Sequence, residues 1–287
     1  MNFFADTFWM VAVLPLASAV LIATFARYLQ RKAWWLGAGL MGVALIWSLA
    51  ILFHLAGLGA EHGEAAAEHA TKFLTEPALH AVWTNWAPFG PFQIDMGIQV
   101  DNLTAMMLVV VTLVSFCVQV YSSGYFEASE KRFTRFYAAI NLFSLGMIGL
   151  VLADNLFLLL VSWEIMGLCS YLLIGHWYEQ EWPKMGQIKA FLTTRVGDVG
   201  MMVGIWIIFS VTNALSWTKL AETIPELVKE PTNAALLALG AILIFTGAIG
   251  KSAQFPLHTW LPDAMAGPTP GSAIIHAATM VAAGVYL

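Results

Sequence analysis

The sequence contains few charged residues for its length. Only 11% of its 287 residues are Asp, Glu, Lys or Arg, whereas a soluble domain carries about 25%. Thirteen basic and eighteen acidic side chains are too few to cover the surface of a soluble protein of this size, and 59% of the residues are hydrophobic. The composition therefore excludes an ordinary soluble protein and indicates a membrane protein with several spans.

Cysteines and clustered cations are also scarce. Cys117 and Cys169 are single residues in apolar runs without C-x-x-C spacing, which argues against an iron–sulfur cluster and a disulfide framework. We interpret both as small packing residues and predict no cofactor-binding residue. The net charge is −5 and the basic residues form no single patch, so nucleic acid is not an expected partner.

Long apolar runs dominate the chain. A helix needs about 20 apolar residues to cross a hydrocarbon core of about 30 Å. Eight runs approach this length, at residues 8–26, 34–58, 103–121, 136–152, 156–178, 187–212, 234–263 and 271–287. The first run is too long for a signal peptide and has no basic residue before it, so we interpret it as a retained helix. The sequence predicts an all-α, polytopic bundle of about eight transmembrane helices.

The basic residues indicate how these helices are oriented. Eight of the thirteen lie in alternate connections, at Arg27, Arg31, Lys32, Lys131, Arg132, Arg135, Lys184 and Lys189. The opposite connections contain only Lys72, Lys219 and Lys229. Because basic connections stay in the cytoplasm, this bias predicts a multi-pass protein of the cell inner membrane with its N-terminus outside.

A long external connection, residues 59–102, separates two N-terminal helices in 1–58 from the helix bundle of 103–287. Its first half is rich in acidic residues and histidine, at Glu61, His62, Glu64, Glu68 and His69. These spacings could gather a metal ion, but a solvated acidic helix explains them better, and we predict no metal site. Residues 83–100 alternate around prolines and a glycine as a β-hairpin does, and such a hairpin would contact a neighbouring subunit.

Ionisable side chains inside the predicted spans are the candidates for function. A charge near the bilayer centre costs roughly 2.5–3.5 kcal/mol, so each one needs a partner or a role. Glu164 is the only charged residue of 156–174, which favours a proton-binding or cation-pairing site over a permanently protonated carboxyl. Arg195 and Asp198 lie at i and i+3 on one helix face, where they either neutralise each other or leave Asp198 as a movable counter-charge.

A lysine and two histidines complete the candidates. Lys251 ends a seventeen-residue apolar run and is either a snorkelling residue or a buried one. The segment after it contains Pro256 and Pro262 and does not become a charged loop, so we predict one broken helix that lines protein or a watery cavity. Histidine takes and gives protons near neutral pH, so His276 in the last run is a candidate site residue and His258 a possible relay.

Three motifs carry a resemblance to a known family. They are SWEIMGLCSYLLIG at 162–175, TTRVGDVG at 193–200, and GKSAQFPLHTWLPDAMAGPTPGSAIIHAATMVAAGVYL at 250–287. In this order they closely resemble the antiporter-like subunit L of bacterial NADH-quinone oxidoreductase and its mitochondrial counterpart, subunit 5 of complex I. The resemblance is strong from residue 95 onward and weak over the first two predicted helices.

The resemblance implies a fold and a function. Family members are proton-translocating subunits of the membrane arm, built from two inverted five-helix repeats, of which this chain would contain only the first. They carry no redox centre, so NADH, FMN, iron–sulfur clusters and quinone are expected in other subunits of the NADH:quinone oxidoreductase. Those membrane-arm subunits, the lipid bilayer and the protons themselves are the implied partners.

The resemblance also implies roles for individual residues. Glu164 matches the essential glutamate of the fifth helix, and Lys251 matches the lysine at the break of the seventh helix, which pairs with that glutamate. Arg195 and Asp198 match a pair on the sixth helix. His276 matches a histidine that passes protons along a central polar axis.

Other functions fit part of the same pattern. The large subunit of a multisubunit sodium/proton antiporter shares the lysine and glutamate motifs and belongs to a transporter. A haem-binding membrane anchor would use His54, His176 or His276 as axial ligands, but these histidines form no matched pair on facing helices. A purely structural membrane subunit is the third alternative.

Overall fold

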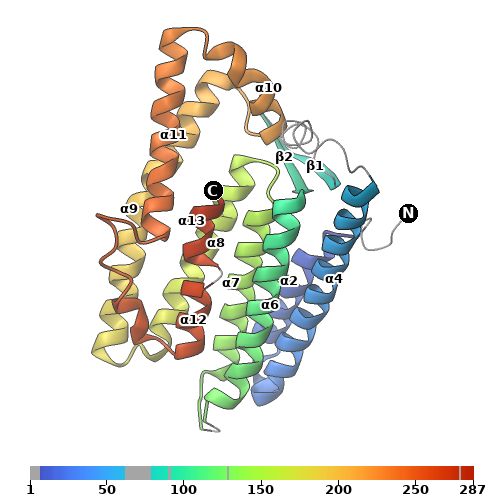
Figure 1. Cartoon of the computed structure of the whole chain (residues 1–287). Coiled ribbons are helices and arrows are strands. Elements are labelled where there is room, and N and C mark those ends of the chain that lie inside the picture. Colours follow the sequence, from blue (N-terminus) through green and yellow to red (C-terminus); the bar gives the residue numbers. More distant parts are fainter. Residues whose placement is uncertain (1–6, 62–78, 90–91, 128, 278) are drawn as a thin grey trace.

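The computed structural model describes residues 7–61, 79–89, 92–127, 129–277 and 279–287. Its helices are α2 (Met10–Thr24), α3 (Ala26–Leu29), α4 (Ala33–Glu61), α6 (Asn102–Tyr125), α7 (Phe133–Leu152), α8 (Leu156–Ile174), α9 (Glu181–Thr212), α10 (Trp217–Leu227), α11 (Pro231–Lys251), α12 (Thr269–Ala277) and α13 (Met280–Tyr286). The 3-10 turns η1 (Gln30–Lys32), η2 (Gly175–Trp177) and η3 (Asp263–Ala266) join some of them, and β1 (Leu79–Phe89) pairs with β2 (Phe92–Val100). The chain is a bundle of apolar helices with one hairpin (Figure 1).

Within the described residues, six helical segments are long and apolar enough to cross a membrane. They are Ala26–Ala56, Asn102–Tyr125, Phe133–Leu152, Leu156–Trp177, Glu181–Thr212 and Pro231–Lys251, and each corresponds to one predicted run. The first and last predicted runs are helical but shorter than a span. Helix α2 has 15 residues, and the last run is divided between α12 and α13. The polytopic helix bundle is confirmed, and in the described residues six predicted runs form full-length helices while the first and last runs form the shorter helices α2, α12 and α13.

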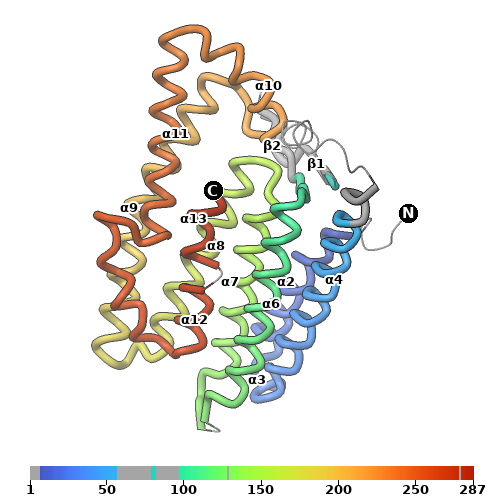
Figure 2. Tube along the Cα trace, in the orientation of Figure 1, coloured from blue at the N-terminus to red at the C-terminus, as the bar shows by residue number. Residues whose placement is uncertain are grey.

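Helices α7 and α8 form the centre of the bundle. Helices α2, α4 and α6 pack around α7, whereas α9 and α11 form a pair that reaches the centre through α8 (Figures 1 and 2). Burial follows this arrangement, because 72% of the most apolar stretch of α7 is buried inside the protein but only 28% of that of α11. Much of the α9–α11 pair therefore faces the surroundings of the protein.

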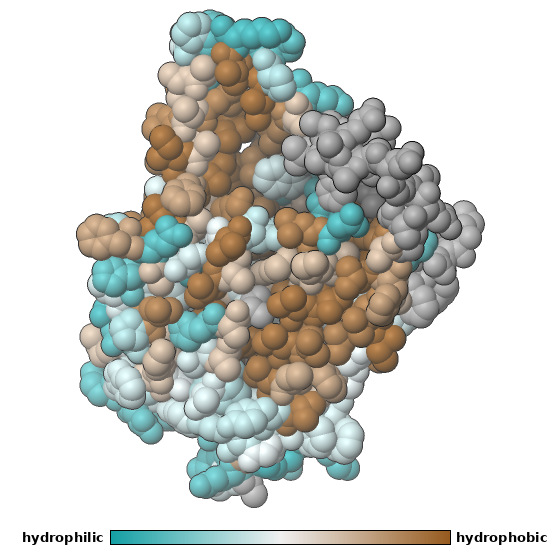
Figure 3. Space-filling model, in the orientation of Figure 1, coloured by the Kyte–Doolittle hydropathy of each residue, from teal (hydrophilic) through white to brown (hydrophobic). Residues whose placement is uncertain are grey.

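The three basic connections meet at one end of the bundle. The Arg31 guanidinium donates a hydrogen bond to the Phe126 carbonyl oxygen, 3.2 Å away, just after α6. Arg132 donates to the carbonyl oxygen of His176, 3.1 Å away after α8, and forms an ion pair with Glu179. On the visible face, hydrophobic residues form a broad patch right of centre and another along α11, whereas hydrophilic residues gather at the top and bottom and extend along the left side (Figure 3). The connections that carry the basic bias thus lie on one side.

The opposite end is organised by the turn between α7 and α8. Ile98 of β2 forms an isolated bridge with Ala153, and Asn155 forms another with Ser216, just before α10. The Asn155 side chain also accepts a hydrogen bond from the Leu158 backbone N–H at 2.7 Å, which caps the start of α8. The hairpin, the α7–α8 turn and α10 are therefore joined at this end.

The hairpin is longer than the sequence predicts. Strand β1 begins at Leu79, four residues before the predicted start, and pairs antiparallel with β2 from Leu79↔Val100 to Phe89↔Phe92. Most of the acidic, histidine-rich part of this connection, with His62, Glu64, Glu68 and His69, lies outside the described residues. A contact of the hairpin with a neighbouring subunit stays a prediction.

The helix break lies at Lys251, where the resemblance implies it, and ahead of both prolines. Helix α11 ends at Lys251, whereas the predicted run continued to residue 263. Ala253 has a φ angle of 51°, a left-handed conformation that cannot continue a right-handed helix. The Gly250 carbonyl oxygen accepts hydrogen bonds from the Trp260 indole N–H at 2.9 Å and from the Ala253 backbone N–H at 3.4 Å, which cap the end of the helix. The two prolines therefore lie in the segment after the break and not inside a helix.

Glycines let α9 and α11 approach closely. A Cβ atom added at Gly197 would lie 2.6 Å from the carbonyl oxygen of Thr246, and one at Gly204 would lie 2.6 Å from that of Gly240. Small residues at helix contacts permit such backbone proximity in membranes. These contacts fix how α11 sits on α9, and so fix the position of Lys251.

We expect Gly197→Ala to destabilise the protein, because the added methyl group meets backbone atoms that cannot move aside. The overpacking costs about 1–3 kcal/mol. Gly39→Ala is the matched control, since nothing lies within 4 Å of a Cβ at Gly39. Thermal unfolding of the purified protein in detergent measures both variants. Equal unfolding midpoints for the two would contradict the close α9–α11 contact.

Candidate functional site

The four charged candidates come together where α8, α9 and α11 meet. Glu164 lies on α8, Arg195 and Asp198 lie on α9, and Lys251 is the last residue of α11. Helix α9 contacts both α8 and α11, so its two charged residues face both neighbours. Residues from three separate runs of the sequence thus form one charged cluster.

The partners within this cluster differ from those expected. The sequence resemblance pairs Lys251 with Glu164, and the i, i+3 spacing allows Arg195 to neutralise Asp198. Instead, Arg195 Nη1 pairs with Glu164 Oε2, and Lys251 Nζ lies 3.7 Å from Asp198 Oδ2. The pairing of Lys251 with Glu164 is therefore wrong for this conformation, and of the two alternatives for Asp198 the structure fits a counter-charge for a second group. Its physical reason is the close glycine packing of α11 on α9, which brings Lys251 next to the residue that follows Gly197.

The Lys251–Asp198 pair is fully enclosed. The two side chains are 0% and 2% exposed. Lys251 Nζ also donates to the backbone carbonyl oxygen of Trp163 at 3.3 Å, and the Trp163 indole N–H donates to Asp198 Oδ1 at 2.6 Å. A Cβ atom added at Gly167 would lie 2.6 Å from Lys251 Nζ, so a side chain there would displace the ammonium group. Lys251 is thus a buried residue, not a snorkelling one.

The Arg195–Glu164 pair is more open. Its side chains are 33% and 25% exposed, and the Arg195 guanidinium lies 4.7 Å from the centre of the Phe191 ring. Only Oε2 of Glu164 contacts Arg195, while Oε1 is buried and has no hydrogen-bond partner among the described residues. A buried carboxylate oxygen without a partner is a place where a proton or a water molecule would be stabilised.

The two pairs act on each other electrostatically. The charges of Asp198 and Lys251 reach Glu164, and the charges of Glu164 and Arg195 reach Lys251. Two cations and two anions leave the cluster neutral when all four groups are charged. Charges that are shielded from water interact strongly because little solvent screens them. A change in the protonation of one group therefore changes the electrostatic free energy of the other three. The cluster can therefore respond as a unit to one proton.

His276 lies on α12 and stacks against Trp260, with ring centroids 6.1 Å apart. Both of its ring nitrogens are buried without a hydrogen-bond partner within the described part of the chain. Trp260 also bonds to Gly250, the residue before Lys251. The structure therefore links His276 to the helix break through Trp260, and shows no direct bond from His276 to the charged cluster.

His258 is exposed and lies 5.9 Å, between ring centroids, from Phe255. His258 follows Lys251 by seven residues, but α11 ends at Lys251, so the two residues do not share a helix face. Of the haem-ligand candidates, His176 lies against Phe126 and Phe136 near the basic end, whereas His276 lies on Trp260. The two rings thus have separate surroundings.

Sequence reasoning missed three residues of the site. Trp163, Trp260 and Gly167 contact the charged residues or the helix break, yet none is ionisable. Trp163 is adjacent to Glu164, and Trp260 lies within the segment after Lys251. For the two tryptophans, the available signal was an indole N–H to satisfy within an apolar helix or at the helix break.

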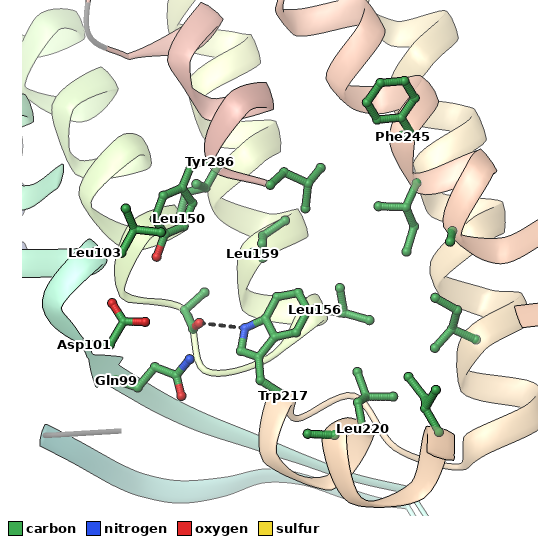
Figure 4. Close-up of a pocket in the computed structure, with 17 residues that line it drawn as sticks. Gln99, Asp101, Leu103, Leu150, Leu156, Leu159, Trp217, Leu220, Phe245 and Tyr286 are labelled. Carbon is green, nitrogen blue, oxygen red and sulfur yellow. Dashed lines mark hydrogen bonds between the residues drawn. The ribbon is translucent and has the colours of Figure 1, made fainter. Parts of the chain in front are cut away.

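The structure also contains an apolar cavity of about 550 Å³ between α8, α10, α11 and α13. Its lining includes Leu156, Leu159, Leu220 and Phe245, and Trp217 at its edge donates a hydrogen bond to the Ala153 carbonyl oxygen (Figure 4). None of the five candidate residues lines it. Among the described residues, no three His, Cys, Asp or Glu side chains are grouped so as to bind a metal ion. The charged cluster remains the candidate site.

Two family models match the chain. One, described as NADH:quinone oxidoreductase/Mrp antiporter, TM, matches residues 153–287. The other, described as NADH-Ubiquinone oxidoreductase (complex I), chain 5 N-terminus, matches residues 86–137. The first match contains the whole charged cluster and His276.

Curated relatives and solved structures show the same similarity. NAD(P)H-quinone oxidoreductase chain 5 of Synechocystis sp. is 47% identical over 73% of this chain and 31% of its own length. NAD(P)H-quinone oxidoreductase chain 5 of Picosynechococcus sp. is 39% identical over 97% of this chain and 40% of its own length. This chain thus spans less than half the length of these relatives. The structure of the Mrp complex from Dietzia sp. matches with a TM-score of 0.76 and 29% identity, over 98% of this chain and 27% of that one. An archaeal membrane-bound sulfane sulfur reductase matches with a TM-score of 0.75, 20% identity, and coverage of 96% and 51%, which shows the fold alone.

The pairing can be tested through stability. Lys251→Met leaves Asp198 buried without its cation, and breaking a buried pair costs about 3–5 kcal/mol. We expect a second change, Asp198→Asn, to restore most of the loss, because the uncharged amide can still accept the Trp163 hydrogen bond. Glu164→Gln in the Lys251→Met background is the matched control and should restore nothing. Thermal unfolding midpoints are compared for the unchanged protein, Lys251→Met and the two double variants. If Glu164→Gln restored the stability of Lys251→Met and Asp198→Asn did not, Lys251 would pair with Glu164.

Proposed function

The chain belongs to the family of antiporter-like membrane subunits found in NADH:quinone oxidoreductases and Mrp antiporters, and we propose from this that it translocates protons in an NADH:quinone oxidoreductase. Its contribution couples electron transfer from NADH to quinone, in other subunits, to proton movement across the membrane. The residues that carry this function are Glu164, Arg195, Asp198, Lys251 and His276.

One observation supports the proposal above all others. A lysine with no exposed surface and a half-satisfied carboxylate lie in the same cluster, on three helices long enough to cross a membrane. Ionisable groups at such positions are costly, and in membrane proteins they mark ion and proton pathways. A packing role would be served by uncharged side chains at lower cost.

The proposed mechanism uses exchange of partners within the cluster. In the present arrangement Asp198 holds Lys251, and Arg195 holds Glu164. A change in the electrostatics of the membrane arm, caused by distant quinone reduction, moves Lys251 toward Glu164 and releases or admits a proton at the open oxygen Oε1. The proton enters from the side of the basic connections and leaves toward His276 at the helix break.

The remaining parts of the proposal concern the setting of the chain. It performs no redox chemistry itself, and NADH, FMN, iron–sulfur clusters and quinone bind to other subunits of the complex, which are its partners in the bilayer. The clustering of Arg31 and Arg132 at one end supports a cytoplasmic position for that end, which places the N-terminus outside the inner membrane.

A second candidate function is that of the large subunit of a multisubunit Na+/H+ antiporter. The similarity to the Mrp complex of Dietzia sp. supports it, because it covers nearly the whole of this chain. The identities to chain 5 of quinone oxidoreductases are higher, and they favour the first function. In membrane vesicles of the source organism, NADH-driven acidification lost on deletion of the gene supports the oxidoreductase, whereas loss of only Na+-driven proton exchange supports the antiporter.

Substitution of the cluster tests the site. We expect Lys251→Met and Glu164→Gln to lower NADH-driven proton uptake into inverted membrane vesicles by tenfold or more, because each removes a group that must change its charge or partner; tenfold corresponds to about 1.4 kcal/mol. The measurement is fluorescence quenching of a pH-sensitive dye, with the amount of assembled complex determined on native gels.

Lys229→Met is the matched control for the lysine substitution. Lys229 is 69% exposed and pairs with Glu226 outside the spans, so its removal should leave proton uptake within twofold of the unchanged protein. Normal proton uptake in assembled Lys251→Met complexes would refute the proposed site.

A further inference from the structure

Trp163 contacts both members of the enclosed pair. Its indole N–H donates to Asp198 Oδ1 at 2.6 Å, and its backbone carbonyl oxygen accepts from Lys251 Nζ at 3.3 Å. The ammonium nitrogen also lies 5.6 Å from the centre of the indole ring, within the range of a cation–π interaction. The side chain is fully buried. One residue thus provides the lysine with a carbonyl and an aromatic face, and the aspartate with a donor.

The indole N–H fixes how the Asp198 carboxylate is turned. Oδ1 accepts from Trp163, and Oδ2 is then the oxygen that lies 3.7 Å from Lys251 Nζ. Without this donor the carboxylate is free to rotate toward Arg195, which lies at i−3 on the same helix. Arg195 would then be shared between Asp198 and Glu164.

Trp163 and Glu164 are adjacent in α8 but contact different ion pairs. Consecutive residues of an α-helix point about 100° apart, so Trp163 and Glu164 face different neighbours. Trp163 faces the Lys251–Asp198 pair, and Glu164 faces Arg195. Of these adjacent residues, Trp163 holds the carboxylate that pairs with Lys251, and Glu164 is itself the carboxylate that pairs with Arg195.

We propose that Trp163 is a positioning residue for proton translocation, which holds Asp198 as the counter-ion of Lys251 and thereby leaves Arg195 to Glu164. This inference rests on the proposed function of the cluster. In this arrangement the uncharged Trp163 side chain determines which carboxylate pairs with which cation. It thereby sets the ion pairs that are present before each proton transfer. Loss of one hydrogen bond to a charged group corresponds to about a tenfold or larger change in the balance between two arrangements.

The test removes the indole N–H and keeps the shape of the ring. Trp163 is replaced by its benzothiophene analogue, in which sulfur takes the place of the N–H group, and separately by Phe, in the full chain within its complex. NADH-driven proton uptake is measured in inverted vesicles as a function of pH. Trp206→Phe is the control, because Trp206 lies on α9 with 66% of its surface exposed and outside the cluster. Lys251→Met is measured in the same series.

We expect the benzothiophene variant to assemble and to lose about tenfold in proton uptake at neutral pH. As the pH is raised, its remaining activity should disappear at a lower pH than that of the unchanged protein. The profile moves because an anion held less firmly near Lys251 retains the lysine proton less well. Trp206→Phe should change neither amplitude nor profile. A structural role alone would lower the amount of complex and leave the shape of the pH profile unchanged.

Each remaining outcome gives a decision. Full activity with an unchanged pH profile in the benzothiophene variant would overturn the inference and leave the proposed function intact, provided that Lys251→Met is inactive. Normal activity of Lys251→Met would instead overturn the proposed function. Failure of both Trp163 variants to accumulate would assign Trp163 to folding and would also overturn the positioning role.

Discussion

A lysine side chain with no exposed surface needs its charge balanced inside the protein, and much of the structure around Lys251 follows from this requirement. Asp198 supplies the opposite charge, and Trp163 supplies a carbonyl oxygen and orients the carboxylate. The pair exists only because α11 lies close to α9, which the glycine contacts at Gly197 allow. The end of α11 at Lys251 is part of the same arrangement, since the Trp260 indole N–H donates to the Gly250 carbonyl oxygen at that end.

The two ion pairs of the cluster are unequal, and the difference has a functional meaning. The Lys251–Asp198 pair is enclosed and has several further contacts, whereas the Arg195–Glu164 pair is partly open and leaves one carboxylate oxygen without a partner among the described residues. A group that is fully satisfied resists a change of protonation, while a half-satisfied carboxylate accepts one more readily. Under the proposed function, the open pair receives the proton first and the enclosed pair responds to the altered charge.

Much of the fold follows from the sequence, because membrane helices are defined by long apolar runs and little else. The six full-length helices, the hairpin and the grouping of Arg31 and Arg132 with the other basic connections were predictable on that basis. The end of α11 at Lys251 was implied by the family resemblance but not by the prolines, because prolines mark where a helix cannot continue and the turn at Ala253 lies ahead of both of them. The identity of the charged candidates was likewise accessible from their presence in apolar runs. Their pairing could not be predicted from the sequence. The spacing of residues within one helix shows which of them share a face, but it does not give the axial position of one helix relative to another.

The exchange of partners constrains how the cluster can work. If Lys251 alone moved toward Glu164, Asp198 would be left buried with only the Trp163 donor, and an unpaired buried charge is strongly unfavourable. The least costly rearrangement therefore moves both pairs together, with Arg195 turning toward Asp198 along its own helix as Lys251 turns toward Glu164. A proton added to Glu164 frees Arg195 to turn toward Asp198, but Glu164 can balance the charge of Lys251 only after it loses that proton, so the exchange begins with proton uptake and is completed by proton release. Proton uptake and partner exchange are then one coupled step, which is what a subunit that converts a distant electrostatic change into proton movement requires.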